Sequence, residues 1–170
     1  MIDLQFNKNT SVALSGHREL SKDFSKTKLK TELINAIENG YKTFYNGLAQ
    51  GFDLIAMQIL VDLKKEYNIN IVCCIPHKDQ AKNFSIFDKK LYNNLIEFAD
   101  KKVIISQEYF KGCMFERNRY MVDNSTYLIT YLNKNKGGTF YTYKYALKNG
   151  LEIKNIANVS KNLSFFDSEI

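Results

Sequence analysis

The chain has 170 residues, a length that suits one domain with a buried core and leaves too little chain for two. Hydrophobic residues make up 45% and charged residues 25% of the sequence, which excludes a disordered or fibrous chain. No apolar run approaches the ~18 residues needed to span a bilayer. The N-terminal residues lack a signal-peptide pattern, and the three cysteines fit neither a disulfide framework nor a zinc pattern. These features predict a cytoplasmic domain without a membrane segment.

The formal net charge is +6, and lysines dominate the basic residues. Lysines on solvated helix faces serve solubility, whereas nucleic-acid-binding proteins usually concentrate charge in a stripe or tail. The pattern therefore disfavours nucleic acid as a partner. The three arginines, Arg18, Arg117 and Arg119, stand out because a guanidinium can hold a phosphate or carboxylate with two parallel hydrogen bonds.

Short apolar runs alternate with amphipathic stretches along the chain. A β-rich run at 10–16 precedes a helical pattern at 24–39, and a strand at 41–47 precedes an apolar helix at 51–67. A buried strand at 68–76 is followed by a helix at 84–98 and a strand at 101–106. A short helix at 115–124, a strand at 125–132, a helix at 139–149 and a strand at 151–156 complete the pattern.

The helix at 84–98 has an apolar stripe at steps of three and four residues, which predicts its buried face. The stripe consists of Phe84, Phe87, Leu91, Leu95 and Phe98.

Strand–helix alternation of this kind predicts a single Rossmann-like α/β domain, an open and mostly parallel sheet with helices on both faces. We expect the domain to span residues 1–157 and residues 158–170 to form a C-terminal tail. In such folds ligands bind beyond the carboxyl ends of the strands, at the topological switch point.

The first candidate segment at that edge is SGHRE (15–19). A turn of small residues at Gly16 leaves backbone N–H groups open to an anion, and Arg18 can add a charge-assisted pair. His17 is a further candidate ligand-binding residue and could serve there as an acid or base. The alternative is a tight turn with a surface arginine.

The second segment is NGLAQGFD (46–53), which opens a helix. Gly47 and Gly51 permit close backbone approach, and a helix N-terminus favours negative charge. Asp53 could accept hydrogen bonds from a ribose or a base, or it could only stabilise the first turn of the helix.

The third segment is FERNR (115–119), in which a helix directs consecutive side chains apart. Arg117 could hold a ligand together with Asn118, or form a surface ion pair with Glu116. Arg119 is expected to point away from the site.

The fourth segment is NKGGTF (135–140), between a strand and a helix. Gly137 and Gly138 at a helix start form a phosphate cradle, and Thr139 can cap the helix or touch the phosphate. The alternative is a flexible turn with a helix cap. The chain contains neither GxxxxGK followed by Ser or Thr nor GxGxxG, so no Walker A or standard dinucleotide motif is present.

His17 and His77 both follow predicted strands, but no cysteine or carboxylate pattern accompanies them, so neither a metal nor a cofactor is predicted. Cys73 and Cys74 lie within a buried strand and are assigned to the core.

In this order the segments SGHRE, NGLAQGFD, ERNRYMVDNSTYLITYL and KGGT resemble the SLOG superfamily, named for Smf/DprA and Lonely-guy proteins, and within it the small YpsA-like bacterial and phage branch. The resemblance covers residues 10–156 and implies a nucleotide-binding Rossmann-like domain that forms a homo-oligomer. The ligand contacts that it implies are Gly16, Arg18, Gly47, Gly51, Asp53, Arg117, Asn118, Gly137, Gly138 and Thr139.

The Lonely-guy enzymes of this superfamily cleave the N-glycosidic bond of nucleoside monophosphates, with an MxER-like segment and the motif PGGxGTxxE. Met114, Glu116 and Arg117 resemble the first segment. The second motif departs from the family, since no proline precedes Gly137 and no acid follows the glycines. The glutamate that a glycosidase needs is therefore absent from its usual place, and catalysis would fall to Glu116 or Asp53.

Three functions follow from these patterns. The first is a module that senses or sequesters a nucleotide-derived small molecule, for example in antiphage signalling. The alternatives are a nucleotide N-glycosidase or deoxyribosyltransferase, and single-stranded DNA binding.

Overall fold

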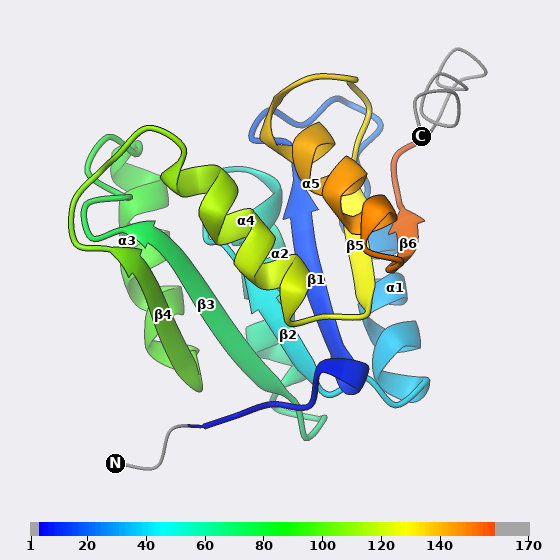
Figure 1. Cartoon of the computed structure of the whole chain (residues 1–170). Helices are drawn as coiled ribbons and strands as arrows, with labels where there is room; N and C mark the ends of the chain where they lie inside the picture. Colours follow the sequence, from blue (N-terminus) through cyan, green and yellow to red (C-terminus); the bar gives the residue numbers. More distant parts are fainter. Residues whose placement is uncertain (1–3, 159–170) are drawn as a thin grey trace.

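Six parallel strands form one sheet in the computed structural model, which describes residues 4–158 (Figure 1). Neighbouring strands follow the order β4-β3-β2-β1-β5-β6, and every neighbouring pair is parallel, so the predicted fold class is confirmed. The predicted tail at 158–170 lies, apart from Asn158, outside the described residues. The strands are β1 (Ser11–Gly16), β2 (Thr43–Asn46), β3 (Asn70–His77), β4 (Lys101–Ser106), β5 (Tyr127–Tyr131) and β6 (Glu152–Asn155).

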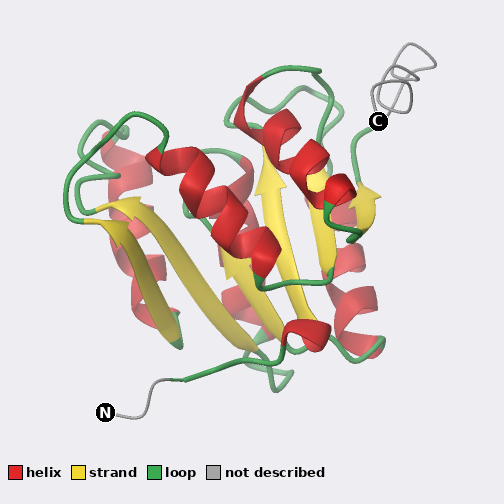
Figure 2. Cartoon of the chain, in the orientation of Figure 1, coloured by secondary structure: helices red, strands yellow, loops and turns green. Residues whose placement is uncertain are grey.

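Helices cover both faces of the sheet, as the alternating pattern predicts (Figure 2). The helices α1, α2 and α3 cover one face, and α4 and α5 cover the other, in front of the sheet in this view. The helices are α1 (Lys26–Glu38), α2 (Phe52–Leu63), α3 (Ile86–Leu95), α4 (Cys113–Asp123) and α5 (Gly137–Lys148), with short 3-10 segments at Lys8–Thr10 and Ile96–Phe98.

Each face of the sheet contributes to its own apolar cluster, because successive side chains of a strand point to opposite faces. Val12 and Leu14 of β1 pack in the cluster beneath α1, α2 and α3, whereas Ala13 packs in the cluster beneath α4 and α5. Cys73 and Cys74 are divided between the clusters in the same way and are fully buried, which confirms their assignment to the core.

The predicted buried face of the helix after β3 is partly wrong. Phe87 and Phe98 are 86% and 52% exposed, and the buried side chains of α3 are Tyr92 and Leu95. This helix lies beside the sheet edge, where it packs on α2. The apolar stripe of the helix is therefore wider than the part of it that α2 and the sheet bury.

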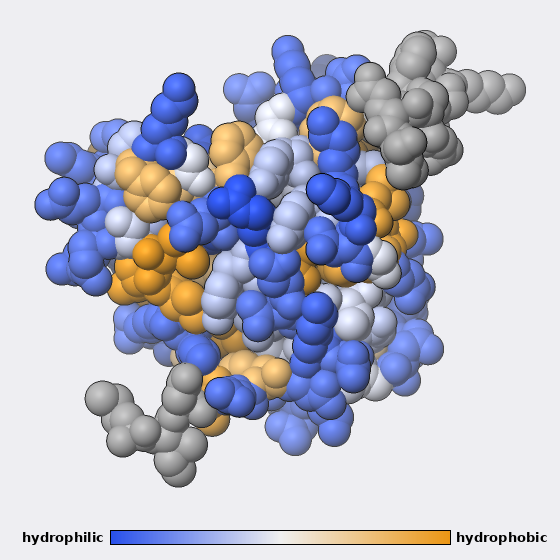
Figure 3. Space-filling model, viewed as in Figure 1, coloured by the Kyte–Doolittle hydropathy of each residue, from blue (hydrophilic) through white to orange (hydrophobic). Residues whose placement is uncertain are grey.

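The edge strand β4 is half-buried or exposed along its whole length. Figure 3 shows an apolar area on this side of the face that α4 and α5 cover, while the surface of the two helices is largely hydrophilic. None of the helices between residues 4 and 158 is long and apolar enough to cross a membrane.

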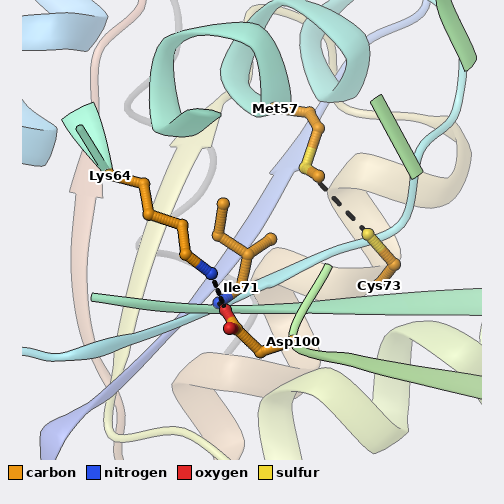
Figure 4. Close-up of polar contacts among 5 residues, drawn as sticks. All are labelled: Met57, Lys64, Ile71, Cys73 and Asp100. Atoms are coloured by element: carbon orange, nitrogen blue, oxygen red, sulfur yellow. Dashed lines mark hydrogen bonds and ion pairs between the residues drawn. The ribbon is translucent and has the colours of Figure 1, made fainter. Parts of the chain in front are cut away.

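Asp100 joins the start of β4 to β3 and α2 (Figure 4). Its carboxylate accepts a hydrogen bond from the backbone N–H of Ile71 (2.7 Å) and pairs with Lys64. Cys73 and Met57 meet through their sulfur atoms nearby, 4.0 Å apart. The contacts of Asp100 stabilise the amino ends of β3 and β4. The loops that follow the strands lie at the opposite edge of the sheet.

The topological switch point lies between β1 and β5. From β1 the chain builds β2, β3 and β4 outward on one side, then returns to place β5 against the other side of β1. The segments that follow β1 and β5 therefore diverge at the carboxyl edge, the usual place of a ligand site in open α/β sheets.

Candidate functional site

A cavity of about 400 Å³ opens at this switch point. We call it the switch-point cavity. Segments following β1, β2, β4 and β5 line it, so the four predicted segments do converge. Its walls include eight of the predicted residues: Gly16, His17, Arg18, Asp53, Arg117, Asn118, Gly138 and Thr139.

The loop after β2 delivers the carboxyl group of Asp53 to the cavity. Asn46 shapes this loop, since its side-chain amide donates to the Asp53 carbonyl oxygen (2.9 Å) and accepts from the Leu48 N–H (2.7 Å). Leu48 has a φ of +53°, a conformation that a bulky side chain rarely adopts and that this hydrogen bonding supports. Asn46 is fully buried, and the sequence analysis did not single it out as a positioning residue.

The two carboxylate oxygens of Asp53 differ in their environment. Oδ2 accepts a hydrogen bond from the Ala49 N–H (3.2 Å), whereas Oδ1 is buried without a partner within residues 4–158. Burial raises the pKa of Asp53 from its ordinary value of 3.8 to about 6, although Arg117 and the Ala49 N–H oppose the shift. The carboxyl group therefore titrates close to neutrality and has one oxygen free for a donor.

Arg117 is buried beside Asp53 and is already engaged with the protein. Its Nη1 donates to the Gly47 carbonyl oxygen (2.6 Å), and its Nε donates to Asn118 Oδ1 (2.7 Å). Burial lowers the pKa of Arg117, and the Asp53 carboxylate opposes that shift. The alternative of a surface ion pair with Glu116 is wrong, because Arg117 is only 4% exposed.

Three of the predicted glycines have a packing role. A Cβ at Gly47 would lie 2.3 Å from Arg117 Nη1, and a Cβ at Gly16 would lie 2.2 Å from the Phe52 ring. Gly51 has a φ of +81°, and its Cβ would lie 2.1 Å from the Arg18 carbonyl oxygen. These close contacts explain the need for glycine without a ligand, and ligand contact at these positions stays a prediction.

Arg18 differs from Arg117 because its side chain is exposed. Its backbone packs against Gly51, while the side chain lines the cavity. Among the residues that the structure describes, its guanidinium has no hydrogen-bond or ion-pair partner. Arg18 is thus the arginine that is available to an incoming anion.

The helix after β5 starts two residues earlier than predicted, so the glycine pair lies inside it. Helix α5 begins at Gly137, and no side chain caps its N-terminus. Nothing lies within 4 Å of a Cβ built on Gly137, and the nearest atom to one on Gly138 is Asn118 Nδ2 at 3.8 Å. The first turn of α5 is therefore open toward the cavity.

The other two helices that begin at the cavity share this feature. Helices α2 and α4 have Gly51 and Gly112 at their N-caps and no side-chain cap. By contrast, Ser25 and Ser85 cap α1 and α3, whose first turns do not line the cavity. Three helix N-termini without a side-chain cap thus converge on one hollow. At α2 the N–H groups of Phe52 and Leu54 already donate to the carbonyl oxygens of His17 and Ala49, so the first turns of α4 and α5 are the ones whose N–H groups and dipoles favour an anion.

His17 holds a loop in place and does not carry the positive charge that would bind an anion. Its Nε2 accepts a hydrogen bond from the Asn133 N–H (3.2 Å), so this nitrogen carries no proton. Burial lowers the pKa of His17, and Lys134 adds to the shift. The side chain is therefore a neutral imidazole that ties the end of β1 to the loop after β5.

A polar cluster that the sequence analysis missed links the loop after β1 to the loop after β5. The Tyr131 hydroxyl donates to Asp23 Oδ1 (3.2 Å) and accepts from Asn133 Nδ2 (3.2 Å), and Ser21 Oγ contacts both Tyr131 and Asp23. These residues lie up to 112 positions apart in the chain, so no local motif marks them.

Glu116, the other candidate catalytic acid, is exposed on α4 and is not among the residues that line the cavity. Arg119 also points elsewhere, donating to the Tyr141 hydroxyl (2.7 Å). No group of three or more potential metal ligands occurs among residues 4–158. Asp53 is the carboxylate that lines the cavity.

Two solved structures have a similar fold. DNA processing protein A (DprA) from Streptococcus pneumoniae gives a TM-score of 0.65 at 19% identity, over 94% of this chain and 54% of that one. A single-stranded DNA binding mode is described for the DprA of Helicobacter pylori. Its structure gives a TM-score of 0.63 at 21% identity, over 86% of this chain and 64% of that one. This chain thus spans less than two thirds of either DprA, and the two likenesses show the fold.

Sequence relatives are similar in length to this chain. The SPbeta prophage-derived protein YoqJ of Bacillus subtilis is 29% identical over 140 residues, 71% of this chain and 81% of the relative. A UPF0398 protein of Listeria monocytogenes is 24% identical over 151 residues, 81% and 83% of the two chains. The family model for YpsA matches residues 11–160, and the chain therefore belongs to the YspA SLOG family.

Proposed function

We propose that the switch-point cavity binds a nucleotide or a nucleotide-derived small molecule through its phosphate and ribose. The N-termini of α4 and α5 and the exposed guanidinium of Arg18 offer N–H donors and positive charge to a phosphate. The open first turn of α5 allows a phosphate to approach the backbone at Gly138. Lys111 lines the same cavity and adds to its positive charge.

The observation that carries the proposal is the unpartnered oxygen of Asp53. A buried acceptor without a donor is costly, and natural proteins keep one mainly where a ligand or water supplies the donor. Inorganic phosphate at neutral pH would bring negative charge and few donors to this oxygen. A ribose brings hydroxyl donors, so a phosphate joined to a ribose complements both parts of the cavity.

Binding without turnover is the reading that we favour. Asp53 is the one candidate acid that lines the cavity, and the glycine loop lacks the glutamate that follows it in the Lonely-guy motif. A glycosidase needs a positioned carboxylate for the departing base or the attacking water. We therefore propose a sensor or sequestering module, with N-glycosidase activity as the alternative that product analysis decides.

The test combines binding and turnover in one sample. The purified protein is incubated with mononucleotides, ADP-ribose, its cyclic forms and cyclic dinucleotides, and bound and free molecules are identified by mass spectrometry. We expect an intact nucleotide to be recovered with the protein. Accumulation of free base or ribose phosphate would instead establish an enzyme.

Two variants test the site itself. Arg18→Ala should weaken binding of the recovered nucleotide about tenfold or more, because it removes a charge-assisted contact to phosphate. Lys22→Ala removes an exposed positive charge from the same loop outside the cavity and should leave binding unchanged. Equal affinities of the wild-type and Arg18→Ala proteins would contradict the assignment of this cavity.

Single-stranded DNA binding is the second candidate, since the Helicobacter pylori protein of similar fold binds such DNA. An aromatic row on α4 and α5 could stack on bases: the rings of Phe115 and Tyr141 are 4.5 Å apart, and Tyr141 is stacked with Tyr145 at 6.4 Å.

A further inference from the structure

A second cavity, of about 720 Å³, lies beyond the carboxyl ends of β3 and β4. We call it the outer cavity. It shares Arg18, Ala49, Tyr109 and Met114 with the switch-point cavity, so the two adjoin along a common wall. A molecule held by its phosphate at α5 can therefore extend past Arg18 and Ala49 into the outer cavity.

Gln80 places a fixed acceptor in this second cavity. Its side-chain nitrogen donates to the Gly47 carbonyl oxygen (2.9 Å), and because a carbonyl can only accept, the amide orientation is determined. Gln80 is 7% exposed, and its Oε1 is buried without a partner in the part of the chain that the structure describes. Gln80 thus brings to the wall of the outer cavity an acceptor that no donor of the described residues satisfies.

The same Gly47 carbonyl oxygen accepts the hydrogen bond from Arg117. Gln80 and Arg117 are therefore held by one backbone group, on the outer and the switch-point side respectively. A ligand with donors for both Asp53 Oδ1 and Gln80 Oε1 would satisfy the two orphaned oxygens together.

The walls of the outer cavity suit a flat aromatic group with a donor at its edge. His77 and Tyr109 meet edge to face at 5.5 Å, and Phe84 contributes a third ring. Asp79 and Glu108 balance the positive charges of Arg18 and Lys82 in the lining of this cavity, whereas Lys111 and the N-termini of α4 and α5 belong to the switch-point cavity. A heterocyclic amine matches the rings of these walls and the acceptor of Gln80.

We propose that the outer cavity is the base subsite of the nucleotide site and that Gln80 selects bases that carry an exocyclic amino group. This inference rests on the proposed function, since the phosphate and ribose must lie in the switch-point cavity for the base to reach Gln80. Tyr109, which lines both cavities, stacks on the base at the junction. The ligand then spans the two cavities as a nucleoside 5′-phosphate unit, free or within a larger molecule.

The experiment uses pairs of mononucleotides that differ only in the exocyclic amino group. The pairs are AMP and purine riboside 5′-monophosphate, GMP and IMP, and CMP and 2-pyrimidinone riboside 5′-monophosphate. Affinities are measured by calorimetry for the full-length wild-type protein, Gln80→Met and the control Gln58→Met. Gln58 is exposed on α2 and lines neither cavity.

We expect at least one amino-bearing nucleotide to bind wild-type protein about tenfold more tightly than its partner, because the analogue leaves Gln80 Oε1 unsatisfied. Gln80→Met should lose this preference and Gln58→Met should keep it. Equal affinities within every pair, or a preference that survives Gln80→Met, would overturn the proposal.

Two further measurements test the base subsite independently of the Gln80→Met variant. Tyr109 is 66% exposed, so Tyr109→Ala can be made without disturbing the core, and it should weaken the nucleotide about tenfold and leave ribose 5-phosphate unaffected. In wild-type protein the side-chain amide resonance of Gln80 should shift with the amino-bearing nucleotide and not with its partner. Absence of both effects would overturn the base subsite even if Gln80→Met did not fold.

Ribose 5-phosphate separates the two proposals. It lacks a base, so it should bind wild-type and Gln80→Met proteins equally and bind Arg18→Ala more weakly. If it binds while the nucleotide pairs show no discrimination, the base subsite alone fails. If neither it nor any nucleotide binds, the proposed function fails as well.

Discussion

At Asp53 the chain buries a carboxyl group and leaves one of its oxygens without a partner among the described residues. Its folded-state pKa of about 6 lies above the ordinary value of 3.8, so the folded protein binds this proton more tightly than the unfolded chain does. Ionisation of Asp53 therefore opposes folding. Its contribution to stability is fully present below pH 4 and is lost as the pH rises toward 6.

Asp53→Asn should remove this pH dependence. A pKa difference of that size corresponds to ~3 kcal/mol, so the variant should gain up to that amount relative to wild type between pH 4 and pH 7. Urea unfolding of both proteins at a series of pH values measures the difference. If the difference is the same at pH 4 and pH 7, Asp53 titrates normally in the folded protein. The same variant should bind the nucleotide more weakly, as expected of a site that trades stability for binding.

Gly47 and Gly138 offer a matched pair of alanine substitutions. Gly47→Ala should lower the free energy of unfolding by ~1–3 kcal/mol, because the new Cβ would lie 2.3 Å from Arg117 Nη1 and 3.0 Å from Asp53 Oδ2. Gly138→Ala should be neutral or slightly stabilising, since its nearest neighbour is 3.8 Å away and alanine suits a helix better. Only Gly138→Ala should weaken nucleotide binding without a loss of stability, measured by denaturation and calorimetry side by side.

At the scale of the elements, the four inner strands could be predicted because a parallel sheet covered on both faces requires continuous apolar runs. The edge strands β4 and β6 are less buried, and their place in the strand–helix alternation predicts them. Element ends were harder to predict. Gly137 and Gly138 are typical of a loop, yet the helix begins with them: Gly137 has a φ of +87°, a conformation that favours glycine, and it leads directly into the first turn. Periodicity places Phe87 on the apolar face of its helix. It predicts which residues share a face and not how much of that face the neighbouring elements cover, and Phe87 is exposed.

The site was predictable in part for the same reason. Residues in the segments between a strand and the first turn of the next helix, such as Arg18 and Asp53, are brought to one edge by the topology. Asn46 and Gln80 were missed because their roles depend on hydrogen bonds that form only in the folded chain. The contact between Gln80 and the Gly47 carbonyl spans 33 positions, and the contact between Arg117 and the same carbonyl spans 70.

The polar cluster of Ser21, Asp23, Tyr131 and Asn133 holds the loop that carries Arg18 against the loop before α5. Tyr131→Phe should lower the free energy of unfolding by ~1–2 kcal/mol and weaken nucleotide binding, because the hydroxyl of Tyr131, a residue that is 1% exposed, contacts all three other members of the cluster. Tyr145→Phe is the matched control, since within residues 4–158 its hydroxyl donates to Asp123 alone (2.7 Å), and it should change stability by ~0.5 kcal/mol or less. Comparable losses in both variants would argue against a role for the cluster in the site.

At the scale of the whole molecule, the charge of +6 supports attraction to any polyanion. The homo-oligomer and the cytoplasmic location expected from the sequence stay predictions, and the partly uncovered edge strand β4 is where an additional strand could pair. What distinguishes the two candidate functions is where the positive charge lies. Arg18 and the N-termini of α4 and α5 surround one cavity, whereas the lysines are distributed over the chain.

Single-stranded DNA binding should therefore be weak and dominated by salt-dependent contacts. We expect the affinity for a fluorescent 20-nucleotide strand to fall at least ~100-fold between 50 and 200 mM salt, as counterion release predicts for dispersed phosphate contacts. Tyr141→Ala, in the middle of the aromatic row, should leave that affinity unchanged, and excess nucleotide should not displace the strand. Fluorescence anisotropy measures all three. An affinity that persists at 200 mM salt and is lost in Tyr141→Ala would make DNA the ligand and α4 and α5 its binding surface, because stacking depends on the rings and little on salt.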